Sequence, residues 1–268
     1  MYDTTHTVHE LDRYRYVDTE PSSTQVPVLL LYGLMGGIGN WDDTITALSE
    51  RGFRVIVPEF PIYSFPVPET NLAGLVGFVH EFSNAIGIEE AVIGGNSLGG
   101  HIAALFAHAH SDRTRAMILT GASGIFEVNL GNSIMRRRDK KYLRSRIEKT
   151  FYDPAMCTHE MLEYVIEVIN DRDRAVRLIR LARSVQNGSV RDLLPKISAK
   201  TLLIWGANDQ ITPLEVAETF HRGIPDSELR FIDRCGHAPM LEQPEEFNTL
   251  LIEFLERVIP EQKRAYAS

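Results

Sequence analysis

The segment Ala91-Val92-Ile93-Gly94-Gly95-Asn96-Ser97-Leu98-Gly99-Gly100-His101 joins an apolar run to an alanine-rich run with helical spacing. This order predicts a buried strand that passes directly into a helix, with Ser97 at the turn between them. A serine at such a turn is held in a strained conformation that exposes its oxygen. Gly95 and Gly99 fit because the two backbones crowd each other there. The alternative is a glycine-rich turn in which Ser97 only caps the helix.

Strand and helix signals alternate on both sides of this segment. The predicted strands are residues 26–32, 54–58, 90–95, 116–120, 200–205 and 229–232. The predicted helices outside the middle of the chain are residues 41–50, 72–86, 98–109 and 244–258. Such alternation predicts an α/β fold, with a mostly parallel central sheet flanked by helices.

The middle of the chain, residues 125–194, shows helical signals alone, at about 133–150, 158–170 and 172–186. We therefore predict an inserted all-helical cap over a core made of residues 1–124 and 195–268. Between Ile125 and Pro195 there are 14 Lys and Arg against 10 Asp and Glu, although the whole chain has a net charge of -8. The basic run 136–141 is interpreted as a solvated helix face or as a lid that attracts anionic substrates.

Composition limits the class of protein. The chain has 268 residues, of which 44% are hydrophobic and 24% charged, as in an ordinary soluble protein. Its acidity disfavours nucleic acid as a partner, and no apolar run reaches the roughly 18 residues that span a bilayer. Two cysteines, Cys157 and Cys235, make no disulfide framework. We expect a cytoplasmic protein, monomer or homodimer, that binds a small-molecule substrate and neither nucleic acid nor membrane.

A serine hydroxyl is a weak nucleophile, so it needs a base, and the base needs an acid that orients it. Asp209 follows the predicted strand 200–205, and His237 follows the predicted strand 229–232. Both therefore lie at strand ends, where catalytic loops gather. Ser97, Asp209 and His237 are the predicted catalytic residues, with Asp209 as a helix-capping loop residue the alternative.

Acyl transfer also needs donors for a developing oxyanion. We assign the main-chain N–H of Leu98, directly after the serine, and that of Leu34, in the glycine-rich loop after the strand 26–32. The N–H of Met35, one residue further on, is an alternative to that of Leu34. A second alternative is that residues 33–37 only make a tight turn and bind no oxyanion. The predicted lining of a substrate pocket is Tyr32, Gly33, Met35, Asn96, Phe126, Met135 and Ala238.

The segments LLLYGLMGG, GGNSLGGHIA, LLIWGANDQITP and CGHAPMLEQPEEF resemble the α/β-hydrolase superfamily over essentially the whole chain. Within it, Asn96 and Cys235-Gly236-His237 look like the meta-cleavage-product hydrolases, which cut carbon–carbon bonds in vinylogous 1,5-diketones. Enol-lactonases and carboxylesterases are similar too. The chain departs from the usual patterns. It has Tyr32 where His usually opens the oxyanion loop, Ala238 where the carbon–carbon hydrolases usually have Trp, and a stretch 59–64 without the usual glycines.

The resemblance implies a serine hydrolase that needs no metal or organic cofactor. We expect a small or medium carboxylic ester or lactone as substrate, cleaved through an acyl-enzyme. One alternative is a carbon–carbon hydrolase in which a cap arginine such as Arg177, Arg180 or Arg183 binds a carboxylate tail. The other is a ligand receptor built on the same scaffold.

Overall fold

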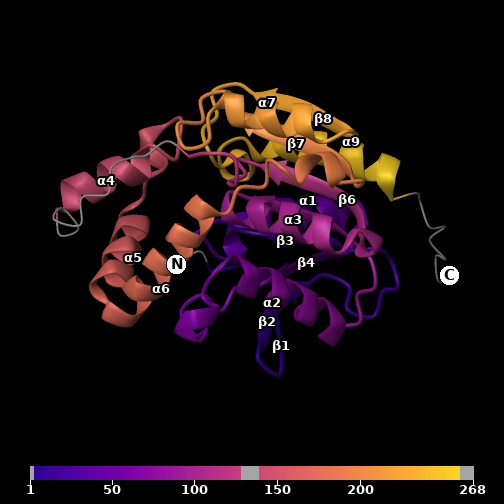
Figure 1. Ribbon diagram of the computed structural model, residues 1–268, viewed down its shortest axis with the longest axis horizontal. Helices are drawn as coiled ribbons and strands as arrows, with labels where there is room; N and C mark the ends of the chain where they lie inside the picture. Colours follow the sequence, from indigo (N-terminus) through magenta and orange to yellow (C-terminus); the bar gives the residue numbers. More distant parts are fainter. Residues whose placement is uncertain (1–2, 128–138, 260–268) are drawn as a thin grey trace.

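The structure of the chain is a computed structural model, and it describes residues 3–127 and 139–259 (Figure 1). These residues form one eight-stranded sheet in the order β1-β2-β4-β3-β5-β6-β7-β8. The pairs β1–β2 and β2–β4 are antiparallel, and every other pair is parallel. The strands are β1 (Val8–Leu11), β2 (Tyr14–Asp18), β3 (Val28–Leu31), β4 (Val55–Pro58), β5 (Ala91–Asn96), β6 (Thr114–Thr120), β7 (Lys200–Gly206) and β8 (Ser227–Ile232).

The central strands β3, β4 and β5 are buried along their whole length. Helices on both faces of a parallel sheet require such continuous apolar strands. The antiparallel edge strands β1 and β2 were not predicted, because polar residues interrupt them. The buried pair of Arg54 and Asp18, whose Nη2 and Oδ2 atoms lie 2.7 Å apart, ties β2 to the residue preceding β4.

Helices lie on both sides of the sheet (Figure 1). α1 packs against α9, and α2 packs against α3. The predicted α/β fold class with its helical cap is therefore confirmed. The helices are α1 (Asp42–Glu50), α2 (Leu72–Ala85), α3 (Leu98–Ala109), α4 (Lys140–Glu148), α5 (His159–Asn170), α6 (Arg172–Asn187), α7 (Leu214–Gly223), α8 (Pro239–Glu242) and α9 (Pro244–Val258).

The cap consists of α4, α5 and α6, which follow one another between β6 and β7 and lie together beyond one end of the sheet in Figure 1. The predicted helix 133–150 is observed as Lys140–Glu148, and its first part falls outside the described residues. The cap boundaries at 125 and 194 stay a prediction. In the described ranges, no helix combines the length and the apolar character needed to cross a membrane.

The strand–turn–helix at Ser97 depends on two glycines. A Cβ on Gly95 would lie 2.2 Å from the carbonyl carbon of Gly99, and a Cβ on Gly99 would lie 2.1 Å from the carbonyl oxygen of Leu31. Real Cβ atoms do not approach backbone so closely, so any larger residue would force β3, β5 and α3 apart. Close backbone approach is what glycine permits.

Candidate active site

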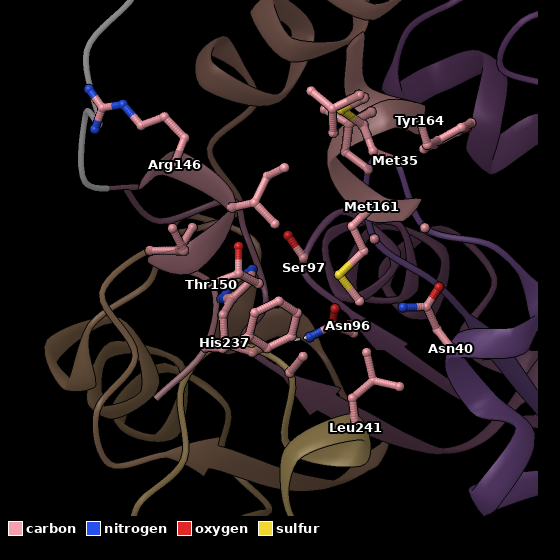
Figure 2. A pocket seen from close by; sticks show the side chains of 18 of the residues that line it. Met35, Asn40, Asn96, Ser97, Arg146, Thr150, Met161, Tyr164, His237 and Leu241 are labelled. Carbon is pink, nitrogen blue, oxygen red and sulfur yellow. Dashed lines mark hydrogen bonds between the residues drawn. The ribbon is translucent and has the colours of Figure 1, made fainter. Parts of the chain in front are cut away.

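Ser97 lies between β5 and α3 with φ 55° and ψ -116°, a conformation that residues with a side chain rarely adopt. Two hydrogen bonds to the chain at the end of β6 hold it there. The Ser97 N–H donates to the Thr120 carbonyl at 3.1 Å, and the Ser97 carbonyl accepts from the Ser123 N–H at 3.1 Å. Backbone strain of this kind is typical of functional sites. It directs the Ser97 side chain into a cavity, as Figure 2 shows.

The imidazole of His237 is hydrogen-bonded to a carboxylate. Its Nδ1 lies 2.8 Å from Oδ2 of Asp209, and both side chains are buried. Asp209 also accepts from the N–H groups of Ile211 and Thr212, at 2.8 and 2.9 Å, and from the Thr212 hydroxyl at 2.8 Å. A carboxylate with so many donors stays ionised. Nδ1 therefore donates to it, and Nε2 remains free to accept a proton.

The charges of Asp209 and His237 counteract the effect of burial on the pKa of each group. Burial raises the pKa of Asp209, but the charge and hydrogen bond of His237 and the N–H groups of Thr212 and Ile211 outweigh it, so the pKa lies below its usual range. Burial lowers the pKa of His237, yet the Asp209 carboxylate raises that pKa above its ordinary value. Each partner thus stabilises the charged form of the other, as an imidazolium formed during a reaction requires.

The loop after β3 lies against the serine. A Cβ on Gly33 would come within 3.1 Å of the Ser97 Cβ, so a side chain there would press on the nucleophile. The Gly36 N–H donates to the Gly33 carbonyl at 3.0 Å, and Met35 between them has φ 64°. The Leu34 N–H finds no acceptor within residues 3–127 and 139–259. It is thus available to a ligand.

The second N–H near the serine belongs to Leu98, the first residue of α3. An N–H in the first turn of a helix has no acceptor within that helix. Together with the helix dipole, it favours negative charge beside Ser97. The assignment of Leu34 and Leu98 to an oxyanion site stays a prediction, with Met35 as the alternative to Leu34.

A cavity of about 340 Å³ opens above Ser97 between the sheet and the cap (Figure 2). Residues of α4 and α5 cover it, so the cap contributes to its shape. Its walls are mainly apolar. The lining residues are Gly33, Leu34, Met35, Gly36, Asn40, Asn96, Ser97, Leu143, Arg146, Ile147, Thr150, Phe151, Met161, Tyr164, Val165, Ile211, His237, Ala238 and Leu241.

Of the predicted lining residues, the structure places Gly33, Met35, Asn96 and Ala238 on this cavity and two others elsewhere. Tyr32 lies on a neighbouring cavity, and its hydroxyl accepts the Phe60 N–H at 2.6 Å, so its assignment to the substrate pocket stays a prediction. Phe126 is not among the described residues that line this cavity, and its side chain is 45% exposed, so its assignment also stays a prediction. The prediction for Met135 lies outside the described residues.

The cap arginines suggested for a carboxylate tail also lie away from the cavity. Nε of Arg177 donates to the Phe65 carbonyl at 2.9 Å, and Nη2 of Arg180 donates to the Pro68 carbonyl at 3.1 Å. Arg183 borders a different groove between α6 and the chain that precedes α2. Within residues 3–127 and 139–259, the arginine on the cavity is Arg146 of α4, whose guanidinium points away from Ser97 (Figure 2).

Comparison with known proteins agrees with this geometry. The model of the alpha/beta hydrolase family matches residues 28–250. The chain belongs to this family. One relative is the 2-hydroxy-6-oxo-6-phenylhexa-2,4-dienoate hydrolase of Comamonas testosteroni. It is 31% identical over 248 residues, a match that covers 85% of this chain and 87% of the relative.

Solved structures of the alpha/beta hydrolase family share the fold over nearly the whole chain. An alpha/beta hydrolase from the metagenome of lagoon sediments of Mar Chica, Morocco, matches with a TM-score of 0.77 and 33% identity, covering 94% of this chain and 98% of that one. The meta-cleavage product hydrolase of Pseudomonas fluorescens IP01 matches with a TM-score of 0.75 and 25% identity, covering 91% and 94%.

The sequence analysis did not identify the residues whose hydrogen bonds hold Asp209 and His237 in place. The Thr212 hydroxyl donates to Asp209, and the Thr150 carbonyl accepts the His237 N–H at 2.7 Å. The Glu242 carboxylate accepts N–H groups on both sides of His237. The short spacing between His237 and Glu242 was the available signal. Within the described ranges, no group of three or more His, Cys, Asp and Glu side chains is arranged to hold a metal.

Proposed function

We propose that this alpha/beta hydrolase cleaves the carbon–carbon bond beside a ketone in a vinylogous 1,5-diketone that carries a carboxylate. The observation that carries the proposal is the Asp209–His237 hydrogen bond at the cavity that Ser97 lines, in a chain 31% identical to a dienoate hydrolase. The ester or lactone substrate that we preferred from the sequence becomes the second candidate.

In the proposed reaction, Ser97, His237 and Asp209 form a catalytic triad. Nε2 of His237 takes the Ser97 hydroxyl proton as the serine oxygen attacks the ketone carbon. Asp209 holds the imidazole in the required tautomer and stabilises the imidazolium. The N–H groups of Leu34 and Leu98 stabilise the oxyanion, and one such donor contributes roughly 3 kcal/mol.

The tetrahedral intermediate then collapses by breaking the carbon–carbon bond. The electron pair of this bond passes through the conjugated double bond to the second carbonyl, and the resulting enolate takes up the proton that His237 received from Ser97. The acyl group stays on Ser97 as an ester. Water that His237 activates hydrolyses the ester and releases a carboxylic acid. The conjugated second carbonyl makes the carbon leaving group feasible, so a simple ketone is not expected to react.

A paired assay tests the proposal. The enzyme is incubated with 2-hydroxy-6-oxo-6-phenylhexa-2,4-dienoate, whose keto tautomer is a vinylogous 1,5-diketone. In a separate assay it is incubated with p-nitrophenyl esters of short and aromatic acids, and kcat/KM is compared. We expect cleavage of the diketone to benzoate and the dienoate fragment, absent in Ser97→Ala. Ester hydrolysis without diketone cleavage would refute the carbon–carbon proposal. Cleavage of neither substrate by the folded chain would favour a receptor.

Two observations favour an ester or lactone as the second candidate. Arg177 and Arg180 are engaged by main-chain carbonyls away from the cavity, and the Arg146 guanidinium points away from Ser97. Ala238 stands where carbon–carbon hydrolases usually have Trp, and it borders the cavity. Among the described residues, no cation on this mainly apolar cavity is aimed at the serine, which suits an uncharged ester. The same Ser97, His237 and Asp209 would act on it.

A further inference from the structure

Four hydrogen bonds converge on the carboxylate of Glu242, the last residue of α8. The Gly236 N–H lies 3.0 Å from each of its two oxygens. The Ala238 N–H lies 3.1 Å from Oε1, and the Tyr152 N–H lies 2.7 Å from Oε2. One side chain therefore binds the main chain on both sides of His237 and also binds the segment that follows α4 of the cap.

This segment of the cap, Thr150–Tyr152, packs directly on the His237 loop. The His237 N–H donates to the Thr150 carbonyl at 2.7 Å. A Cβ on Gly236 would lie 2.7 Å from that same carbonyl oxygen and 2.9 Å from the Tyr152 nitrogen. This close approach requires glycine at position 236. The Glu242 carboxylate accepts the N–H of the same residue. The base, the cap segment and Glu242 thus form one hydrogen-bonded unit.

We propose that Glu242 is a positioning residue, which holds the main chain around His237 so that the imidazole stays aligned between Ser97 and Asp209. The inference rests on the proposed role of His237 as the base. Hydrogen bonds from N–H groups to an ionised carboxylate are roughly twice as strong as those between neutral groups. The Glu242 carboxylate binds main-chain N–H groups, so it acts on His237 through the backbone of residues 236–238.

The same carboxylate also acts through its charge. The charged groups that influence His237 are Asp209, Glu127 and Glu242. Burial lowers the pKa of His237, Asp209 contributes most to raising it, and Glu242 adds to that rise. Removing the Glu242 charge should therefore lower the pKa of His237. This shift reports the charge of Glu242, and the rate at which Ser97 reacts reports the alignment of the base.

The test uses the rate of labelling of Ser97 by a fluorophosphonate, measured against pH in four proteins. They are the wild type, Glu242→Gln, Glu242→Asp and the matched control Glu245→Gln. Gln keeps the size of Glu but presents an NH₂ group to the three N–H donors. Asp keeps the charge, but its side chain is one methylene shorter, so the carboxylate lies farther from the N–H donors. Glu245 is exposed, and its side chain is outside this unit.

We expect Glu242→Gln to label between about tenfold and a hundredfold more slowly, the cost of a misplaced base. Its labelling rate should fall with decreasing pH at a lower midpoint than that of the wild type. Glu242→Asp should label slowly but with the same pH midpoint as the wild type. This variant tests the proposal if Glu242→Gln does not fold. Glu245→Gln should match the wild type in both measurements. Wild-type rate and midpoint in Glu242→Gln would overturn the proposal.

A second measurement separates this proposal from the proposed function. If the folded wild type fails to label, the assignment of Ser97 as nucleophile is wrong, whatever Glu242 does. NMR titration of the His237 ring in wild type and Glu242→Gln then tests Glu242 without any reaction. A lower midpoint in Glu242→Gln supports the link between the two residues, and an unchanged midpoint rejects it.

Discussion

The side-chain amide of Asn96 donates to the main-chain carbonyl of His237 at 2.9 Å, and to the Thr120 carbonyl at 3.1 Å. Asn96 is buried and directly precedes Ser97. The residue next to the serine thus fixes the backbone of the residue that carries the imidazole. The Asn96 amide thereby joins the turn at Ser97 to the loop at His237, although these two residues are 140 positions apart in the sequence.

Replacing Asn96 by Ala should weaken both the fold and the reaction. The buried His237 carbonyl loses its donor, which costs about 1–3 kcal/mol for a group left unpaired, whereas the Thr120 carbonyl keeps the Ser97 N–H. The His237 loop also loses a restraint, so we expect kcat to fall more than KM changes. Urea unfolding and steady-state kinetics measure the two effects. Asn187→Ala, at an exposed position on the cap, is the control, and an equal effect in both variants would contradict the account.

Replacing Asp209 by Asn should reduce kcat about 10⁴-fold, because an amide no longer fixes the tautomer of His237 or stabilises the imidazolium. In the wild type, the rate should fall as pH decreases through the raised pKa of His237, hence above the ordinary value of about 6.5. The loss of the Asp209 charge should move that fall to lower pH. A pH–rate profile of both proteins checks this, and an identical midpoint in the two would exclude the pairing.

The cap should contribute to substrate choice through Met161. Its side chain extends toward Ser97 from α5 (Figure 2). Met161→Ala should lower kcat/KM for a substrate with a phenyl substituent roughly tenfold, since apolar contacts in a pocket discriminate by that order. The kcat/KM for the analogue that carries a methyl group in place of the phenyl group should fall much less. Met156→Ala, which removes a partly buried methionine outside the cavity, is the control. Equal losses for both substrates would argue against contact with the phenyl group.

Acid should destabilise the fold through His101. This residue of α3 is fully buried beside Gly124 and Gly188, near the two connections to the cap. Burial lowers its pKa to about 4, so the unfolded chain binds a proton that the folded chain does not. Stability is therefore lost as pH falls from about 6.5 to about 4, by up to about 3 kcal/mol. His101→Leu should reduce the loss in urea unfolding, with His108→Leu as control. The same loss in wild type and His101→Leu would contradict this.

The sequence predicted the features that short-range patterns encode. Continuous apolar runs identified β3 to β7, and the glycines around Ser97 identified the strand–turn–helix, because their spacing reflects local geometry. Tyr14–Asp18 is short and mixes polar with apolar residues, so its pattern was too weak to identify, although this strand pairs with both β1 and β4. Contacts made by tertiary structure were not accessible either. Glu242 binds main-chain N–H groups, for which its short spacing from His237 was a weak signal. Arg177 and Arg180 bind main-chain carbonyls of the core, which depend on the tertiary fold.

The most direct test of the central claim is to locate the residue that a fluorophosphonate modifies. The folded protein is treated with the probe, digested, and its peptides are mapped by mass spectrometry, in wild type, Ser97→Ala and His237→Ala. The account predicts a single adduct on Ser97 in the wild type, none in Ser97→Ala and strongly slowed labelling in His237→Ala. An adduct on another residue, or labelling of Ser97 at an unchanged rate without His237, would contradict it.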